Sequence, residues 1–254
     1  MELCLVRTNR IVACILMLSP LRAECTSIVA VWTKNRITIV ADSKQTVSDA
    51  NGATTSQKAC KVYQVRNTVF AIAGLAKIDE IDVVNEIKNH TPMRDAKTGA
   101  ILPIESIIIP ASASITKVLI SKHAQYAPNA PIQMLIAGWW DGELRLARWE
   151  MNGLRIIGDY SLPDNVRQYE YPDVRGHDGT DPNRGIETIG MDEAIKAFKA
   201  STPGWNKGSD HAVAERLVTV EINDPNAKQY VGKPISTIVV TKGGIKWKHR
   251  GACK

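Results

Sequence analysis

Three consecutive residues with nucleophilic side chains, Cys25, Thr26 and Ser27, follow a short N-terminal segment whose pattern predicts cleavage. A threonine hydroxyl is a weak nucleophile until a nearby base takes its proton. A free α-amine has an unperturbed pKa of about 7.7–8.0, so an N-terminal threonine carries its own base. Cleavage before Thr26 would therefore create a nucleophile and its general base in one residue, which suits the hydrolysis of an amide bond.

Residues 1–25 have the layout of a secretory signal peptide. Arg7 and Arg10 precede the apolar run from Ile11 to Leu18, and the segment ends on the small-x-small pattern Ala23-Glu24-Cys25. We therefore expect an exported protein, periplasmic or secreted, with a signal peptide at 1–25 and a single domain at 26–254. The alternative interpretation is a start codon assigned too far upstream.

No stable membrane anchor is expected. The apolar run is shorter than the roughly 20 residues that span a bilayer, and no later segment reaches that length. Arg22-Ala23-Glu24 lacks the small, uncharged residues that precede a lipid-modified cysteine. Removal of residues 1–25 would leave Cys60 and Cys253, with Cys25 as a third cysteine if it is retained. An exported protein can pair two of these, but the spacing does not say which.

The composition excludes several classes of protein and of partner. Of the 254 residues, 44% are hydrophobic and 23% are charged, which excludes collagen-like, coiled-coil and disordered chains. The net charge of +6 is not gathered into a stripe, and the longest basic cluster, Lys246 to Arg250, belongs to the C-terminal tail. We therefore expect no nucleic-acid partner.

Several common site motifs are missing from the sequence. It has no Gly-rich phosphate loop, no Gly-x-Ser-x-Gly elbow and no cluster of His and Cys with metal-ligand spacing. The five histidines are scattered, and we interpret each as a surface residue: His90, His123, His177, His211 and His249. The sequence therefore predicts no cofactor, no metal and no serine-type triad.

Runs of strands alternate with pairs of helices along the chain. Four hairpins are predicted, which pair 27–33 with 36–42, 61–65 with 68–73, 132–139 with 143–149, and 235–241 with 245–247. Residues 154–157 are predicted to continue the third hairpin, and residues 187–189 to form a short strand. Helices are predicted over 77–90, 111–125, 192–199 and 209–222, and surface loops over 43–57 and 163–184. This order favours an α+β fold with sheets covered by helices, rather than a doubly wound parallel sheet.

Four motifs between Thr26 and Gly74 resemble the proteasome β-subunit group of the N-terminal-nucleophile (Ntn) hydrolases. They follow one another in the family's order: Thr26-Ser27-Ile28-Val29-Ala30-Val31, Ile39-Val40-Ala41-Asp42-Ser43-Lys44, Lys61-Val62-Tyr63-Gln64 and Ala71-Ile72-Ala73-Gly74. Further along, Leu135-Ile136-Ala137-Gly138 and Thr188-Ile189-Gly190 resemble its central hairpin and a later strand. The resemblance implies a four-layer αββα sandwich of Ntn-hydrolase type and a threonine-type hydrolase of peptide or amide substrates.

The resemblance also implies a role for each residue of the site. Thr26 would be the nucleophile, Lys61 would lie beside it and lower the pKa of its amine and hydroxyl, and Asp42 would hold the lysine. The backbone N–H of Gly74 would stabilise the oxyanion. The alternative is that Asp42 and Lys61 are surface residues at strand ends, and from that position we expect Lys61 to contribute little to packing.

The chain departs from this family at three places. Cys25 stands where self-processing subunits carry Gly, Met191 stands where the family has Ser, and residues 226–232 contain no Asp-x-x-Ser pair. The set of residues that normally supports the nucleophile in this family is therefore incomplete.

Two other functions stay open. Cys25 could be the nucleophile, as in the penicillin-acylase and bile-salt-hydrolase relatives, although Ser43-Lys44 does not supply the Arg and Asp of that group. The chain could also be a catalytically inactive, proteasome-like scaffold subunit. A homo-oligomer is possible, since amphipathic helices suit a ring contact and a monomer's core alike.

Overall fold

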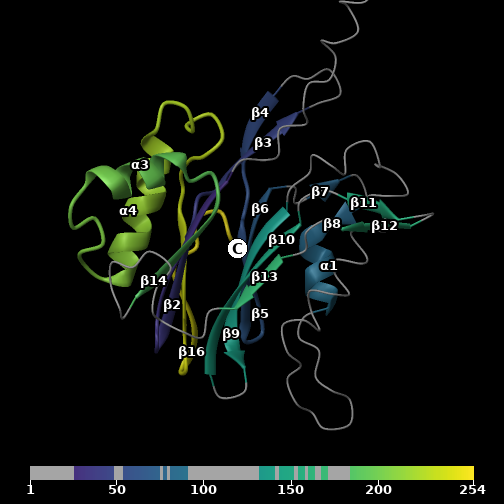
Figure 1. Cartoon of the computed structure of the whole chain (residues 1–254), viewed down its shortest axis with the longest axis horizontal. Coiled ribbons are helices and arrows are strands. Elements are labelled where there is room, and N and C mark those ends of the chain that lie inside the picture. The colour runs from purple at the N-terminus through teal and green to yellow at the C-terminus, as the bar shows by residue number, and fades with distance from the viewer. Residues whose placement is uncertain are drawn as a thin grey trace, which may run out of the picture.

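Two antiparallel sheets of five strands each form the centre of the computed structural model (Figure 1). The structure describes residues 26–48, 54–74, 77–78, 81–90, 132–140, 143–151, 154–157, 160–163, 167–170 and 184–254. The predicted signal peptide and the predicted helix 111–125 lie outside these ranges. No helix within them is both long and apolar enough to span a membrane.

The first sheet has the strand order β14-β1-β2-β15-β16. Its strands are β14 (Gly185–Gly190), β1 (Ser27–Thr33), β2 (Arg36–Ala41), β15 (Ser236–Thr241) and β16 (Gly244–His249). The predicted hairpins β1–β2 and β15–β16 are confirmed, and β15 pairs with β2 so that the two hairpins join in one sheet. β14 pairs along β1, with Ser27 opposite Gly190.

The second sheet has the strand order β13-β10-β9-β6-β5. Its strands are β13 (Arg167–Glu170), β10 (Glu143–Met151), β9 (Ile132–Trp140), β6 (Thr68–Gly74) and β5 (Val62–Val65). The predicted hairpins β5–β6 and β9–β10 are confirmed, and β6 pairs with β9. Arg66, with φ of 54°, occupies the tight turn between β5 and β6.

The strands β1 and β2 of the first sheet are buried on both faces. Successive side chains of a strand point to opposite faces, so β1 divides its residues between two cores. Ile28, Ala30 and Trp32 join the core between the two sheets, where they meet residues of the second sheet such as Ala71 and Leu135. The alternate residues Val29 and Val31 pack with the helices on the outer face. This explains the continuous apolar run in the sequence.

Helices pack on the outer face of the first sheet, and one helix lies beside the second. α3 (Glu193–Ser201) and α4 (Asp210–Asn223) pack on the outer face of the first sheet, and the predicted cap is confirmed because the Ser209 side chain accepts the Ala212 N–H. α1 (Val83–His90) lies beside the second sheet, on the side away from α3 and α4 (Figure 1), with Lys88 Nζ 5.3 Å from the centre of the Tyr63 ring. The described part is thus a mixture of helices and antiparallel sheets.

Two segments differ from the sequence prediction near the site. Residues 43–57 were expected to be a loop, but β3 (Lys44–Ser48) and β4 (Thr54–Lys58) pair as a hairpin. Its residues are polar yet partly β-branched, and side chains 55–58 are exposed, so the pairing needs no apolar face. The helix predicted over 77–90 begins only at Val83, because β7 (Lys77–Ile78) and β8 (Ile81–Asp82) precede it and the Asp82 carboxylate accepts the Asn85 N–H.

The expected surface excursion 163–184 is also partly wrong. β13 lies within it and extends the second sheet as an edge strand beside β10. β11 (Leu154–Ile157) pairs with β12 (Tyr160–Pro163) in a separate two-stranded sheet instead of continuing the central hairpin. Backbone hydrogen bonds alone can add an edge strand of mixed polarity, so a hydrophobic pattern does not reveal it.

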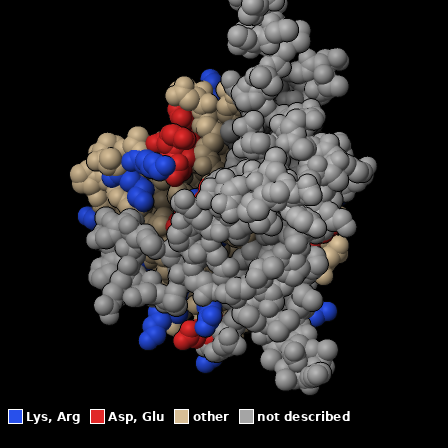
Figure 2. Space-filling view, turned by 45° about the vertical axis from the view of Figure 1, so that its right-hand side comes forward, with Lys and Arg blue, Asp and Glu red and all other residues tan. Residues whose placement is uncertain are grey.

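The exposed charges on one face are mixed in sign. Figure 2 shows basic and acidic side chains close to one another on the described part of that face. Such a mixture is ordinary for a solvated surface and indicates no particular partner.

Glu221 of α4 gives the fold a predicted dependence on pH. Its side chain is fully buried, its Oε2 accepts the Ile195 N–H of α3 at 3.2 Å, and its Oε1 has no hydrogen-bond partner among the described residues. Burial raises the pKa of the Glu221 carboxyl from its ordinary 4.5 to about 7. The folded chain therefore holds a proton that the unfolded chain releases, and stability falls as the pH rises from about 4.5 to about 7.

We predict that Glu221→Gln removes this loss, because the amide is neutral and its oxygen can still accept the Ile195 N–H. A shift of one pKa unit corresponds to about 1.4 kcal/mol. The variant should therefore gain on the order of 3 kcal/mol in free energy of unfolding at pH 8, and almost none at pH 4.5. Urea unfolding at the two pH values measures it. The exposed Glu143→Gln is the control, and equal pH slopes for both variants would contradict the prediction.

Candidate active site

A fully buried carboxylate, Asp42 at the end of β2, is the centre of the site. Its Oδ1 accepts the Ser27 N–H at 3.0 Å and the Lys61 ammonium at 2.9 Å. Its Oδ2 accepts the Lys44 N–H at 2.9 Å and the Gly232 N–H at 3.0 Å. Each oxygen thus has two donors, so both are satisfied inside the protein.

Lys61 is buried as well, with 7% of its side chain exposed, and forms an ion pair with Asp42. The expectation that it contributes little to packing is therefore wrong. Because the two sheets pack face to face, the residue before β5 lies against the end of β2, and its charge faces the carboxylate instead of water. The backbone of Lys61 is also fixed, since its carbonyl accepts the Ile72 N–H at 3.0 Å.

Thr26 lies at the start of β1 and is 2% exposed. Its carbonyl accepts the Met191 N–H at 2.6 Å. Gly190 crosses directly over the same carbonyl, with φ of +83°, and a Cβ on Gly190 would lie 1.8 Å from the Thr26 oxygen. Only glycine fits this position, which explains the glycine that follows Thr188-Ile189.

Gly74 ends β6, with φ of +92°, and is opposite Ile132 of β9. Its neighbour Ala73 approaches β14, because a Cβ on Gly190 would be 3.3 Å from the Ala73 Cβ. The end of β6 therefore lies near the segment that covers Thr26. Of the four residues predicted from the sequence, Asp42 and Lys61 form an ion pair. Thr26 directly precedes Ser27, whose N–H binds Asp42, and Gly74 directly follows Ala73, near the segment that covers Thr26.

Two positions where the chain departs from the family take part in the site through their backbones. The Met191 N–H binds the Thr26 carbonyl, and the Gly232 N–H binds Asp42. Sequence reasoning missed these contacts and those of Ser27 and Lys44. No signal could have revealed them, because every residue except proline has an N–H.

A disulfide joins Cys60 to Cys253, 193 residues later in the chain. It selects one of the pairings that the sequence left open. Cys60 directly precedes Lys61, and Cys253 is buried next to Ser236, whose hydroxyl donates to the Arg250 carbonyl at 2.9 Å. The C-terminal segment is thus covalently fastened beside the lysine of the site.

No model of a known protein family matches this chain, and no curated protein matches it. An assignment of function therefore depends on the geometry of the site and on the motifs that surround it.

We predict that Lys61→Met strongly destabilises the fold. The substitution keeps the length of the side chain but leaves the buried Asp42 charge without its ammonium partner, which costs about 3–5 kcal/mol in comparable buried pairs. Chemical denaturation at pH 7 measures the change. Lys34→Met in the exposed β1–β2 turn is the matched control and should change stability by less than about 0.5 kcal/mol. The double variant with Asp42→Asn should recover part of the loss, and an undisturbed single Lys61 variant would refute the pairing.

We also predict that replacing both Cys60 and Cys253 by Ser lowers the free energy of unfolding by about 2–5 kcal/mol. The disulfide joins residues 193 positions apart, and its loss enlarges the ensemble of unfolded conformations. Unfolding curves with and without reductant measure the effect. Reductant should destabilise the wild type only, and equal curves for the wild type in both conditions would contradict the disulfide.

Proposed function

We propose that this chain is an exported Ntn-type amide hydrolase or peptidase, with a four-layer αββα domain at 26–254 and Thr26 as its nucleophile. The observation that carries the proposal is the buried ion pair of Lys61 with Asp42 at 2.9 Å. The same carboxylate oxygen accepts the N–H of Ser27, the residue directly after Thr26. A lysine held at this point can act on the chemistry of Thr26 by its charge.

In this mechanism the α-amine of a processed Thr26 takes the proton from the Thr26 hydroxyl. The hydroxyl oxygen then attacks the substrate carbonyl, and the Gly74 N–H stabilises the oxyanion that forms. The protonated amine delivers its proton to the leaving amine, which yields an acyl ester on Thr26. Water, deprotonated by the same amine, hydrolyses that ester and regenerates the residue.

The surroundings of Lys61 support its part in this mechanism. A nearby positive charge disfavours protonation of the amine and favours loss of the hydroxyl proton. Asp42 supports that role indirectly, because four donors hold it in place and it in turn orients the ammonium. The tight backbone contacts of Thr26 with Met191 and Gly190 limit the movement of the nucleophile.

Activation follows from the chemistry of the amine. While Thr26 is joined to Cys25, its nitrogen belongs to an amide and has no basic lone pair. Cleavage after Cys25 by signal peptidase, which tolerates small residues at the positions of Ala23 and Cys25, would release the amine. Self-processing subunits use a glycine before the threonine, and this chain would then need none.

We predict that exported protein begins at Thr26 and reacts once per chain with an electrophile selective for N-terminal nucleophiles. Full-length protein made in the cytoplasm should be inert, because its Thr26 nitrogen is acylated. Intact-mass spectrometry measures both the start of the chain and the added label. Thr26→Ser should retain labelling, whereas Thr26→Ala should abolish it.

Two outcomes contradict this mechanism in different ways. A mature start at Cys25 with a reactive thiol would assign the chemistry to Cys25. A start at Thr26 that never reacts would leave an inactive, proteasome-like scaffold. Lys61→Ala should lose hydrolysis under conditions in which circular dichroism shows that the variant is folded, and Lys34→Ala, its control, should keep hydrolysis.

A further inference from the structure

Two histidines and a glutamate meet between α4 and β16, outside the site of Thr26. His211 and Glu215 belong to α4, and His249 is the last residue of β16. One potential ligand atom from each residue lies within 4.8 Å of the other two. The Nε2 of His211 is 3.4 Å from Glu215 Oε1, and the two imidazole rings are stacked with centres 5.9 Å apart.

The fold aims all three side chains at one point. Residues four apart lie on the same face of a helix, which places His211 beside Glu215. The pairing of β15 with β16 shifts register between Thr237 and Ile238 of β15, so that Ile238 is opposite Trp247 but Thr237 is opposite His249. A β-bulge of this kind reverses the side to which the following residue points. It turns His249 to the outer face, toward α4.

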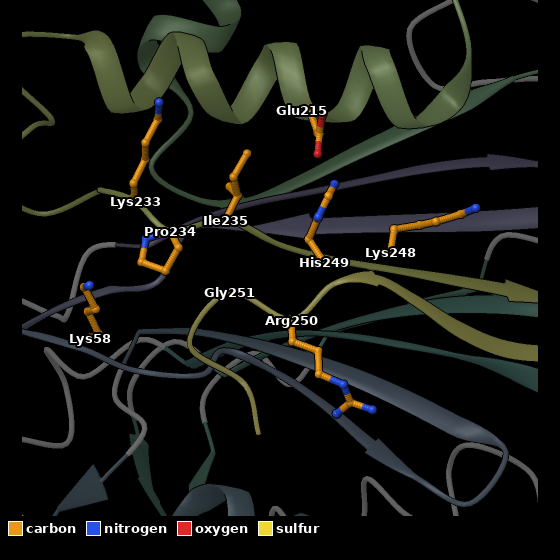
Figure 3. Close-up of a pocket in the computed structure, with 9 residues that line it drawn as sticks. All are labelled: Lys58, Glu215, Lys233, Pro234, Ile235, Lys248, His249, Arg250 and Gly251. Carbon is orange, nitrogen blue, oxygen red and sulfur yellow. The ribbon is translucent and has the colours of Figure 1, made fainter.

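The Glu215 carboxylate of this cluster accepts a further hydrogen bond. Thr237 Oγ1 is 3.4 Å from Glu215 Oε1, to which it donates. Figure 3 shows Glu215 and His249 pointing toward each other across the pocket, while Lys248 and Arg250 extend away from the pair.

One polar atom of the cluster lacks a partner. His211 Nδ1 is buried and has no hydrogen-bond partner among the described residues. Burying such an atom without a partner costs free energy. Because His211 Nε2, and not Nδ1, faces Glu215 Oε1 at 3.4 Å, an ion held between these two residues would bind Nε2.

We propose that His211, Glu215 and His249 bind one divalent transition-metal ion of the zinc class. Two imidazoles and a carboxylate are a donor set of three-ligand zinc sites, with a fourth position left for water. At zinc–ligand distances of about 2.0–2.1 Å, tetrahedral ligand atoms lie about 3.3 Å apart. Small rotations of the partly exposed side chains bring the present cluster to that spacing. The ion would fasten the last strand of the first sheet to the helix that covers it.

Zinc binding to the processed, disulfide-bonded protein tests the proposal. We expect equilibrium dialysis to give one Zn²⁺ per chain, and Zn²⁺ to raise the melting temperature. His211→Ala, His249→Ala and Glu215→Gln should each weaken binding by at least about 100-fold, since loss of a direct ligand should exceed the 10–100-fold effect of supporting residues. His90→Ala is the matched control, because His90 ends α1 beside the other sheet.

A second measurement keeps the test independent of folding. Co²⁺ bound to the wild type should give a visible d–d spectrum, which the three variants lose while their metal-free melting temperatures stay within about 2 °C of the wild type. No Zn²⁺ binding by the wild type at about 100 μM, or unchanged binding in the His211→Ala/His249→Ala double variant, would overturn the proposal. Labelling at Thr26 should be the same in all these variants, so failure here is distinct from failure of the proposed hydrolase.

Discussion

The burial of one negative charge, that of Asp42, constrains much of this structure. A carboxylate removed from water is costly unless its oxygens find donors. Here the donors come from Ser27, Lys44, Lys61 and Gly232, which precede or follow strands of both large sheets and of the β3–β4 hairpin. Apolar contacts between sheets resist sliding only weakly, because many registers bury similar area. The directional bonds to Asp42 select one register at this end of the two sheets.

Lys61 shows how that constraint reaches the rest of the chain. The ion pair fixes its ammonium, the Ile72 N–H fixes its carbonyl, and the disulfide of the preceding residue fastens it to the C-terminal segment. A residue held in three ways cannot move without disturbing the second sheet. Such rigidity suits a charge that must act on a neighbouring group over a short distance, because electrostatic catalysis depends on preorganised charges.

Local patterns predicted the elements whose residues match their surroundings. The β-branched runs of β1 and β2 and the cap at Ser209 are examples, and the structure confirms both. The β3–β4 hairpin escaped prediction because its polar residues form an exposed ribbon that has no apolar side. The burial of Lys61 was not predicted, because its position before a short strand says nothing of the first sheet, which packs over it. The cluster at His211 was not predicted for a related reason. His249 lies 38 residues after His211 in the sequence, and a β-bulge turns it toward the cluster.

The resemblance predicted from the sequence would require a Ser at position 191 and an Asp-x-x-Ser pair within 226–232, and this chain has neither. The backbone N–H groups of Met191 and Gly232 instead bind the Thr26 carbonyl and the Asp42 carboxylate. A backbone donor survives almost any substitution, so these sequence differences leave the support of Thr26 and Asp42 in place. Under the proposed function, the property that separates an inert chain from an active one is then the covalent state of the Thr26 nitrogen. The residues around it are already arranged while that nitrogen is still an amide.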